Sequence, residues 1–239
     1  MDTDIGRAIA VQGIIEPQTT RLVKDLVRPG MQVLDVGANI GYFTLIMAQA
    51  AGLSGRVWAF EPTKKYREQL MWHVENNNLK DIVTLIPYGL SDKTMTTEIS
   101  IGNSSATLHW TAESVPLRQE IIQLHPLDEV AAELGIHQID FVKLDIDGHE
   151  PRFIRGASNS LKRFQPPIVL EFSQLNLHFA GSDVSLQARL LQELGYAICD
   201  ERTRKPYVSD TQFLIDCGNF RYSCNALAIS ETVDRKSNT

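Results

Sequence analysis

The sequence predicts a doubly wound α/β fold built on a mostly parallel sheet of seven strands. Apolar, β-rich runs alternate with runs of helical periodicity along most of the chain. The first β-rich run ends in a glycine-containing loop that passes directly into a helical segment, as in ligand-binding α/β sheets. Strands are expected near residues 31–36, 56–61, 82–87, 140–145, 167–172, 196–200 and 224–229, with helices in most of the gaps.

The chain has 239 residues, of which 43% are hydrophobic, and this suffices for one well-packed domain over residues 31–230. A lead-in of residues 1–30 precedes the domain. Within it, Thr19–Val27 shows helical spacing of apolar residues and ends at Arg28-Pro29-Gly30. This helix is a candidate cover for a bound ligand. Residues 231–239 are expected to form a polar tail.

Composition and charge exclude several classes of partner. The net charge of -6 and the pI near 5.5 leave no basic footprint, so neither nucleic acid nor an anionic membrane is an expected partner. No apolar stretch reaches the length of a membrane span and no signal peptide is recognisable, which favours a cytoplasmic protein. Cys199, Cys217 and Cys224 fit neither a disulfide framework nor a metal-binding spacing, so free thiols in a reducing compartment are expected.

The first strand and its loop occupy Val33–Gly41, and Tyr42 and Phe43 begin the helix that follows. Gly37 and Gly41 are expected to let the backbone pass close to a ligand where a Cβ would collide. The loop therefore predicts a cofactor site.

An acid in this loop indicates which cofactor it binds. Asp35 lies two residues before the first glycine, and Ala38-Asn39-Ile40 stand where the dinucleotide pattern Gly-x-Gly-x-x-Gly requires a second glycine. A carboxylate here repels phosphates but suits a ligand with an ammonium, a sulfonium and ribose hydroxyls. S-adenosylmethionine (SAM) is the cofactor that this chemistry predicts.

A second acid supports the cofactor site. The β-rich run Arg56–Phe60 ends at Glu61-Pro62, roughly 20 residues past the loop, the distance at which an acid binds the ribose of a nucleotide cofactor. Glu61 is therefore expected to hold the ribose diol. Taken alone, the glycine loop could be only a tight turn, and Glu61 could be only a solvated strand end.

Several strand ends carry polar groups that should face one crevice, since ligands of doubly wound sheets bind outside the carboxyl ends of the strands. These groups are Asp35, Glu61, Ser91-Asp92, Asp145 and Glu171.

Residues 93–124 interrupt the alternation of strand-like and helical runs and are expected to form a β-hairpin insertion. Thr94–Ile101 and Gln119–Leu124 resemble antiparallel strands flanking the small-residue loop Gly102–Ser105. The hairpin is either an ornament on the sheet edge or a wall of the substrate pocket.

The chain resembles the FkbM-type methyltransferases from about Gln18 to Ser230. The resemblance rests on Val33–Phe43, Phe60-Glu61-Pro62, Gly89–Asp92, Leu127-Asp128-Glu129 and, above all, Phe141–Glu150 with its sequence Phe-Val-Lys-Leu-Asp-Ile-Asp-Gly-His-Glu. It implies a Rossmann-like class I methyltransferase fold and SAM-dependent O-methylation of a hydroxyl on a sugar, polyketide or other secondary metabolite. The expected cofactor-binding residues are Asp35, Gly37, Ala38, Asn39, Gly41, Tyr42, Phe43, Glu61, Pro62, Ser91, Asp92 and Asp145.

Methyl transfer to an alcohol needs close positioning and a base that removes the hydroxyl proton. His149 is the leading candidate, because Asp147-Gly148 allows a sharp turn that would place His149 and Glu150 at the lip of the crevice. A surface histidine at a helix start is the structural alternative. Asp145 could instead contact the methionine amino group, orient His149 or bind a metal.

A divalent-metal alternative pairs Asp145 with Glu171, and Asn176 is a further candidate ligand. Hard oxygen ligands from adjacent strand ends could hold Mg²⁺ together with a vicinal hydroxyl substrate. SAM without a metal is the favoured interpretation, and Glu171 is otherwise a candidate catalytic residue.

Three rival functions remain open. A nicotinamide-dependent oxidoreductase would share the loop and Glu61, but Asp35 and the missing glycine disfavour it. A nucleic-acid amino methyltransferase would need an aromatic clamp where Ile146-Asp147-Gly148 stands. A catalytically silent SAM-binding module would keep the loop and the acids. The sequence predicts neither the identity of the hydroxylated acceptor nor the oligomeric state.

Overall fold

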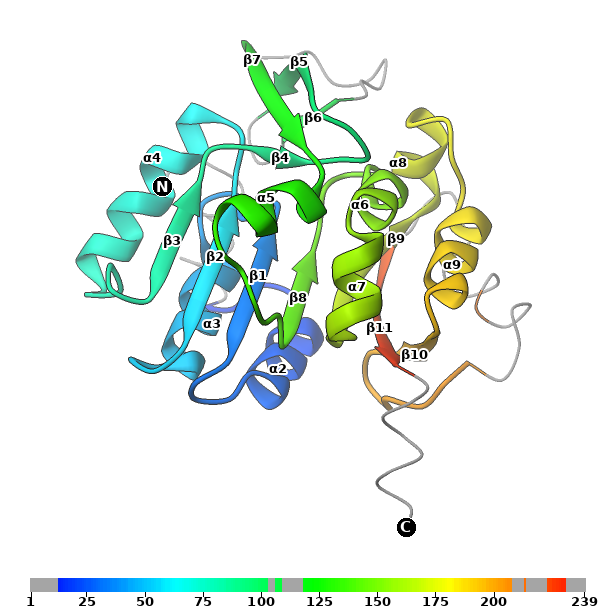
Figure 1. The fold of residues 1–239 in the computed structure, drawn as a ribbon, viewed down its shortest axis with the longest axis horizontal. Helices are drawn as coiled ribbons and strands as arrows, with labels where there is room; N and C mark the ends of the chain where they lie inside the picture. Colours follow the sequence, from blue (N-terminus) through cyan, green and yellow to red (C-terminus); the bar gives the residue numbers. More distant parts are fainter. Residues whose placement is uncertain (1–12, 103–105, 109–117, 208–212, 214–222, 231–239) are drawn as a thin grey trace.

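The computed structural model describes residues 13–102, 106–108, 118–207, 213 and 223–230. Its central sheet contains the seven predicted strands in the order β10-β11-β9-β8-β1-β2-β3 (Figure 1). The fold class predicted from the sequence is therefore confirmed. The strands are β1 (Gln32–Val36), β2 (Arg56–Phe60), β3 (Val83–Ile86), β8 (Phe141–Leu144), β9 (Ile168–Ser173), β10 (Tyr196–Asp200) and β11 (Ser223–Ser230).

The strand pairing accounts for the burial of the central strands and for the position of the crevice. β1 pairs in parallel with both β2 and β8, while β11 is antiparallel to β9 and β10. Every residue of β8 is buried, because helices cover both faces of a parallel sheet. The chain order reverses between β1 and β8, and at such a switch point the two adjoining loops diverge and leave a crevice.

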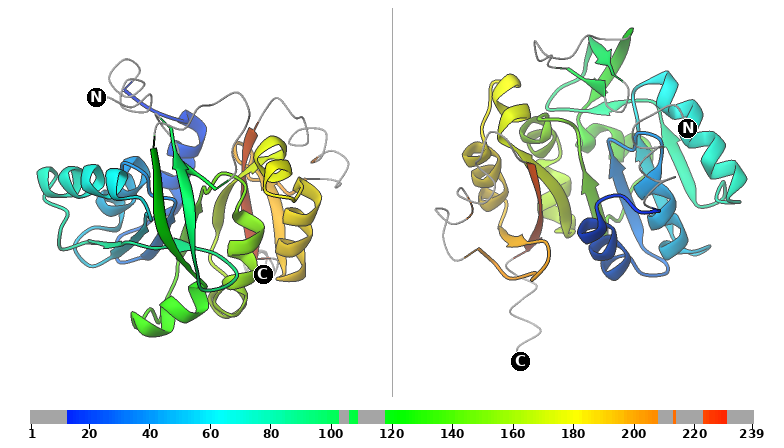
Figure 2. Two further views of the ribbon diagram at one scale, coloured as in Figure 1. Left: turned by 90° about the horizontal axis from the view of Figure 1, so that it is seen from above. Right: turned by 180° about the vertical axis from the view of Figure 1, so that it is seen from behind.

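Two helical layers enclose the sheet (Figures 1 and 2). Alternate residues of each strand join one of two apolar cores, so Val33 packs on one face and Leu34 on the other. One layer consists of α2 (Pro17–Leu26), α3 (Tyr42–Ala51) and α4 (Lys64–Asn76). The other contains α5 (Leu127–Glu133), α6 (Glu150–Gly156), α7 (Ser158–Phe164) and α9 (Val184–Glu193), and the short α8 (Gln174–Phe179) follows β9.

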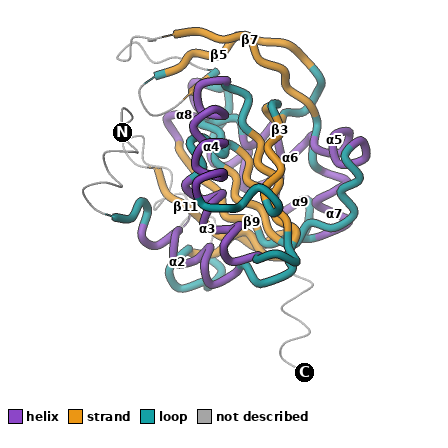
Figure 3. Tube along the Cα trace, turned by 90° about the vertical axis from the view of Figure 1, so that its left-hand side faces the viewer, coloured by secondary structure: helices purple, strands orange, loops and turns teal. Residues whose placement is uncertain are grey.

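The predicted insertion contributes three strands to a second, four-stranded sheet above the carboxyl ends of the main strands, and β4, just before the predicted bounds, supplies the fourth (Figures 1 and 3). The predicted antiparallel pair is present as β5 with β7, but the loop after Gly102 does not join them directly. The chain first makes the short β6, which pairs with β5, and β7 returns later to pair with β4 as well. The strands are β4 (Gly89–Leu90), β5 (Met95–Ile101), β6 (Ala106–Thr107) and β7 (Arg118–His125).

The cysteines differ from expectation. Cys199 is a buried thiol outside any disulfide, as predicted, but Cys224 is disulfide-bonded, so the prediction of thiols without disulfides is wrong there. The sequence pattern could not reveal this, because a single pairing depends on spatial proximity and not on spacing. Cys217, residues 1–12 of the lead-in, the 103–105 loop and the 231–239 tail lie outside the described residues. None of the helices that the structure describes is long and apolar enough to cross a membrane.

Candidate active site

Two adjoining cavities open at the switch point between β1 and β8. Both are partly lined by Gly37, Asn39, Asp145 and Asp147, which therefore form their junction. The first cavity encloses about 620 Å³ and extends under the second sheet; its apolar walls come from β2, β4, β5 and β7. The second encloses about 750 Å³ and extends toward the start of α2 and α3. The predicted insertion thus forms a pocket wall.

The two loop glycines are required by the protein's own packing. Gly37 and Gly41 have φ angles of 85° and 93°, which favour glycine. A Cβ on Gly37 would lie 1.9 Å from the backbone oxygen of Asp145, and one on Gly41 would lie 2.2 Å from Leu70 Cδ1. The chain's own packing therefore already requires glycine at both positions, and the expectation that they also let the backbone approach a ligand stays a prediction.

The backbone N–H groups of the loop already have partners. Gly37 N and Ala38 N both donate to the Phe60 oxygen at 3.1 and 3.0 Å. Asn39 N donates to Glu61 Oε2 at 2.9 Å, and Gly41 N donates to Ala38 O at 2.9 Å. A pyrophosphate-binding loop directs such N–H groups at its ligand. This loop cannot do so without breaking its own bonds.

Glu61 is buried at the end of β2 and lines the first cavity. Its Oε1 accepts hydrogen bonds from Thr63 N at 2.8 Å and Thr63 Oγ1 at 2.7 Å, while Oε2 accepts from Asn39 N. Burial raises the pKa of Glu61 although these hydrogen bonds oppose the shift. A carboxylate offers about four acceptor positions, so one remains for a ligand.

Asp35 is buried at the end of β1 and lines the second cavity. Its Oδ2 accepts a short hydrogen bond from Thr44 Oγ1 in α3. Burial raises the pKa of Asp35 to about 6, against the opposing effects of Thr44 and Lys143. The carboxyl group therefore ionises at a higher pH than an ordinary aspartate.

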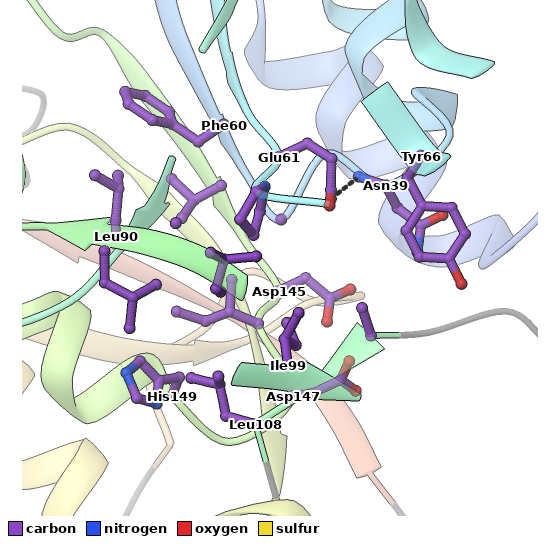
Figure 4. A pocket seen from close by; sticks show the side chains of 18 residues that line it. Asn39, Phe60, Glu61, Tyr66, Leu90, Ile99, Leu108, Asp145, Asp147 and His149 are labelled. Atoms are coloured by element: carbon purple, nitrogen blue, oxygen red, sulfur yellow. Dashed lines mark hydrogen bonds between the residues drawn. The ribbon is translucent and has the colours of Figure 1, made fainter. Parts of the chain in front are cut away.

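Asp145 follows β8 at the centre of the site. Figure 4 shows it between Glu61 and Asp147. Its side chain is partly exposed, and Oδ2 lies 3.0 Å from Lys143 Nζ. Asp145 also lines a third cavity of about 700 Å³, which lies between the start of α2 and the strands β9 and β11.

Asp147 is a site residue that the sequence analysis missed. The sequence predicts only a sharp turn here, and the turn is present, with φ angles of 52° at Asp147 and 95° at Gly148. Its carboxyl group, however, lines both the first and the second cavity. Burial, reinforced by the charges of Asp145 and Glu61, raises the pKa of Asp147 to about 7. A second acid two residues after Asp145 was the signal that could have revealed it.

His149 lies deeper than expected. It is only 6% exposed and lies on the wall of the first cavity, so the expectation that it stands at the crevice lip is wrong. Glu150 is buried as well, and its Oε1 accepts a hydrogen bond from Ile146 N at 2.9 Å, which folds the turn inward. His149 Nε2 lies 3.1 Å from Ser91 Oγ. Its role as the base stays a prediction.

Three of the predicted cofactor residues lie outside the walls of the first and second cavities, and the others line them. Ser91 and Asp92 follow β4 in the second sheet, and neither lines the two cavities; Ser91 is buried with its oxygen against Gly156. Gly41 also lies outside their walls. The remaining nine line one or both cavities: Asp35, Gly37, Ala38, Asn39, Tyr42, Phe43, Glu61, Pro62 and Asp145.

Comparisons with known proteins identify the family. The model of the methyltransferase FkbM domain matches residues 35–198, more than half of the chain. The chain belongs to the FkbM methyltransferase family. It is 28% identical over 180 residues to the hexuronic acid methyltransferase AglP of Haloferax volcanii, covering 74% of this chain and 68% of AglP.

Two solved structures share the fold of this family member. A FkbM methyltransferase from Methylobacillus flagellatus superposes with a TM-score of 0.53 at 17% identity, covering 88% of this chain and 50% of that one. A SAM-dependent O-methyltransferase from Thermotoga maritima gives 0.53 at 15%, covering 91% and 66%. The chain thus spans about half to two thirds of the length of these relatives.

The metal alternative involves the third cavity, which Asp145 and Glu171 both line. Asn176 Nδ2 lies 3.5 Å from Glu171 Oε2 and 3.4 Å from Asp147 Oδ1, so the amide links two of the acids. Burial and the charge of Asp145 raise the pKa of Glu171 well above its usual value. Within the described ranges, no three His, Cys, Asp or Glu side chains are grouped as metal ligands.

Proposed function

We propose that this family member transfers a methyl group from SAM to a hydroxyl group of a small polar molecule. The observation that carries the proposal is the junction of the first and second cavities, where Asp145 and Asp147 meet the loop after β1. A ligand that spans both cavities would place its middle at this junction, and the third cavity also reaches Asp145.

The residues present fit SAM. The first cavity is largely apolar apart from Glu61 and its neighbours, which suits an adenine ring and a ribose. The second is lined by Glu16, Asp35 and the junction acids, and Lys143 is the cation among its described lining residues. These carboxylates favour a sulfonium and an ammonium, whereas the pyrophosphate of a nicotinamide cofactor would be repelled.

The third cavity supports a hydroxyl-rich acceptor. Its lining is almost entirely polar and includes Gln18, Thr19, Glu201, Ser223 and Asn225. Such groups can accept and donate hydrogen bonds to several hydroxyls at once. AglP is named a hexuronic acid methyltransferase, and this supports a sugar as the acceptor class here.

Bound SAM would supply an activated methyl group, so the protein's main task is to hold an oxygen in line with it. Asp145 suits the role of base, since its carboxylate is partly exposed and borders all three cavities. Lys143 would keep this carboxylate oriented through their 3.0 Å contact. Asp145 would take the proton from the acceptor's hydroxyl group.

The test is transfer of a labelled methyl group from SAM to a panel of neutral, acidic and amino sugars. The proposal expects label in an O-methyl ether with the wild-type protein and a loss of roughly a hundredfold or more with Asp145→Asn. A protein that binds SAM but labels no member of the panel would favour the catalytically silent alternative.

A further inference from the structure

Lys143 is an exception within its strand. It is the third residue of β8, between the buried Val142 and Leu144, and it is only 1% exposed. Burying an ammonium group is unfavourable unless charges and hydrogen bonds compensate for the lost water. The sequence pattern predicts only an apolar strand here and no function for Lys143.

The ammonium group of Lys143 is incompletely compensated by the protein. An ammonium has three N–H donors. Within the described part of the chain, one donates to Asp145 Oδ2 at 3.0 Å. The Phe43 ring lies below the charge, with its centroid 5.0 Å from Nζ. Donor capacity therefore remains, and the residue lines the second cavity.

The surrounding charges keep Lys143 protonated. Burial lowers the pKa of Lys143, but the carboxylates of Asp145, Glu16 and Asp35 outweigh this effect and the pKa is raised overall. Thus a permanent positive charge stands among acids on one cavity wall. This arrangement offers both signs of charge within one cavity.

The positive and negative charges on this cavity wall complement the amino-acid end of the proposed cofactor. The amino-acid end of SAM carries an ammonium and a carboxylate on the same carbon, whereas its adenosine end carries neither. Glu16, Asp35 and Asp145 can receive the ammonium, but they would repel the carboxylate unless a cation faced it. Among the described residues that line this cavity, Lys143 is the cation.

We propose, on the basis of the function proposed above, that Lys143 binds the α-carboxylate of SAM. Its buried ammonium group donates to the carboxylate from the floor of the second cavity, while Asp145 holds the lysine in place. This contact fixes the amino-acid end and so sets where the sulfonium lies along the junction.

Calorimetry with two ligands tests the contact without any acceptor. SAM and decarboxylated SAM differ only in the carboxylate, so wild-type protein should bind the decarboxylated form roughly 10- to 150-fold more weakly. Lys143→Met, which keeps a long apolar stem, should bind SAM more weakly by a similar factor. The difference between the two ligands should then largely disappear. Lys80→Met, at an exposed lysine, is the matched control and should behave as wild type.

The possible results distinguish a failure of the proposed lysine contact from a failure of the proposed function. Equal affinity of the wild-type protein for both ligands would overturn the proposal even if Lys143→Met failed to fold. An equal loss for both ligands in Lys143→Met would show that the lysine builds the cavity and does not contact the carboxylate. A wild-type protein that binds neither SAM nor S-adenosylhomocysteine would overturn the proposed function itself.

Discussion

Glu61 gives the sharpest expectation about cofactor affinity. Its carboxylate already accepts three hydrogen bonds, two from Thr63 and one from Asn39, so it is held rigidly at the wall of the first cavity. A hydrogen bond from a ribose hydroxyl to such a fixed charge is worth about 2–3 kcal/mol. Glu61→Ala should therefore weaken binding of S-adenosylhomocysteine by roughly 30- to 150-fold.

Glu61→Ala should also lower the stability of the ligand-free protein, because the N–H groups of Asn39 and Thr63 lose their acceptor. Glu61→Gln keeps one acceptor oxygen and should lose less affinity. Isothermal calorimetry gives the affinities, and thermal unfolding monitors the fold. An alanine variant that melts cooperatively and binds with wild-type affinity would refute the assignment of this acid to the ribose.

Three further expectations follow from the same site. Gly37→Ala should destabilise the protein by about 2–4 kcal/mol in denaturant unfolding, since its Cβ would overlap the Asp145 backbone oxygen; an unchanged midpoint would contradict the packing. Burial raises the pKa values of Asp35 and Asp147 from 3.8 to about 6 and 7, so the folded state binds extra protons and the ligand-free protein should lose stability as pH rises from about 4 to 7. Asp147→Asn should reduce the pH dependence of the melting temperature. A variant whose melting temperature depends on pH as steeply as that of the wild type would contradict the role of Asp147. Because Asp145 is the proposed base, His149→Ala should leave turnover within about tenfold of wild type, and a hundredfold loss would instead support the sequence-based prediction that His149 is the base.

Much of the fold follows from local pattern. Strand boundaries were predictable because buried parallel strands are short apolar runs punctuated by turns, and Asp35 and Glu61 were found because acids at such ends are unusual. The second sheet was only half predicted. β6 has two residues, which is too short for any periodicity to reveal it.

The misjudged parts of the site depend on tertiary geometry. Lys143 is one polar residue in an apolar run, and sequence alone cannot show that its head reaches a cavity. Asp147 has the backbone of a turn, which concealed the direction of its carboxyl group. Ser91 follows β4, which belongs to the second sheet, so its position after a strand did not place it at the crevice of the main sheet.

The identity of the cofactor is the central claim, and direct calorimetry tests it. Purified protein titrated with S-adenosylhomocysteine should show a dissociation constant in the micromolar range or tighter. NAD should bind far more weakly, because the loop N–H groups are occupied and Asp35 and Asp145 repel its pyrophosphate. Binding of NAD with no response to S-adenosylhomocysteine would contradict the account.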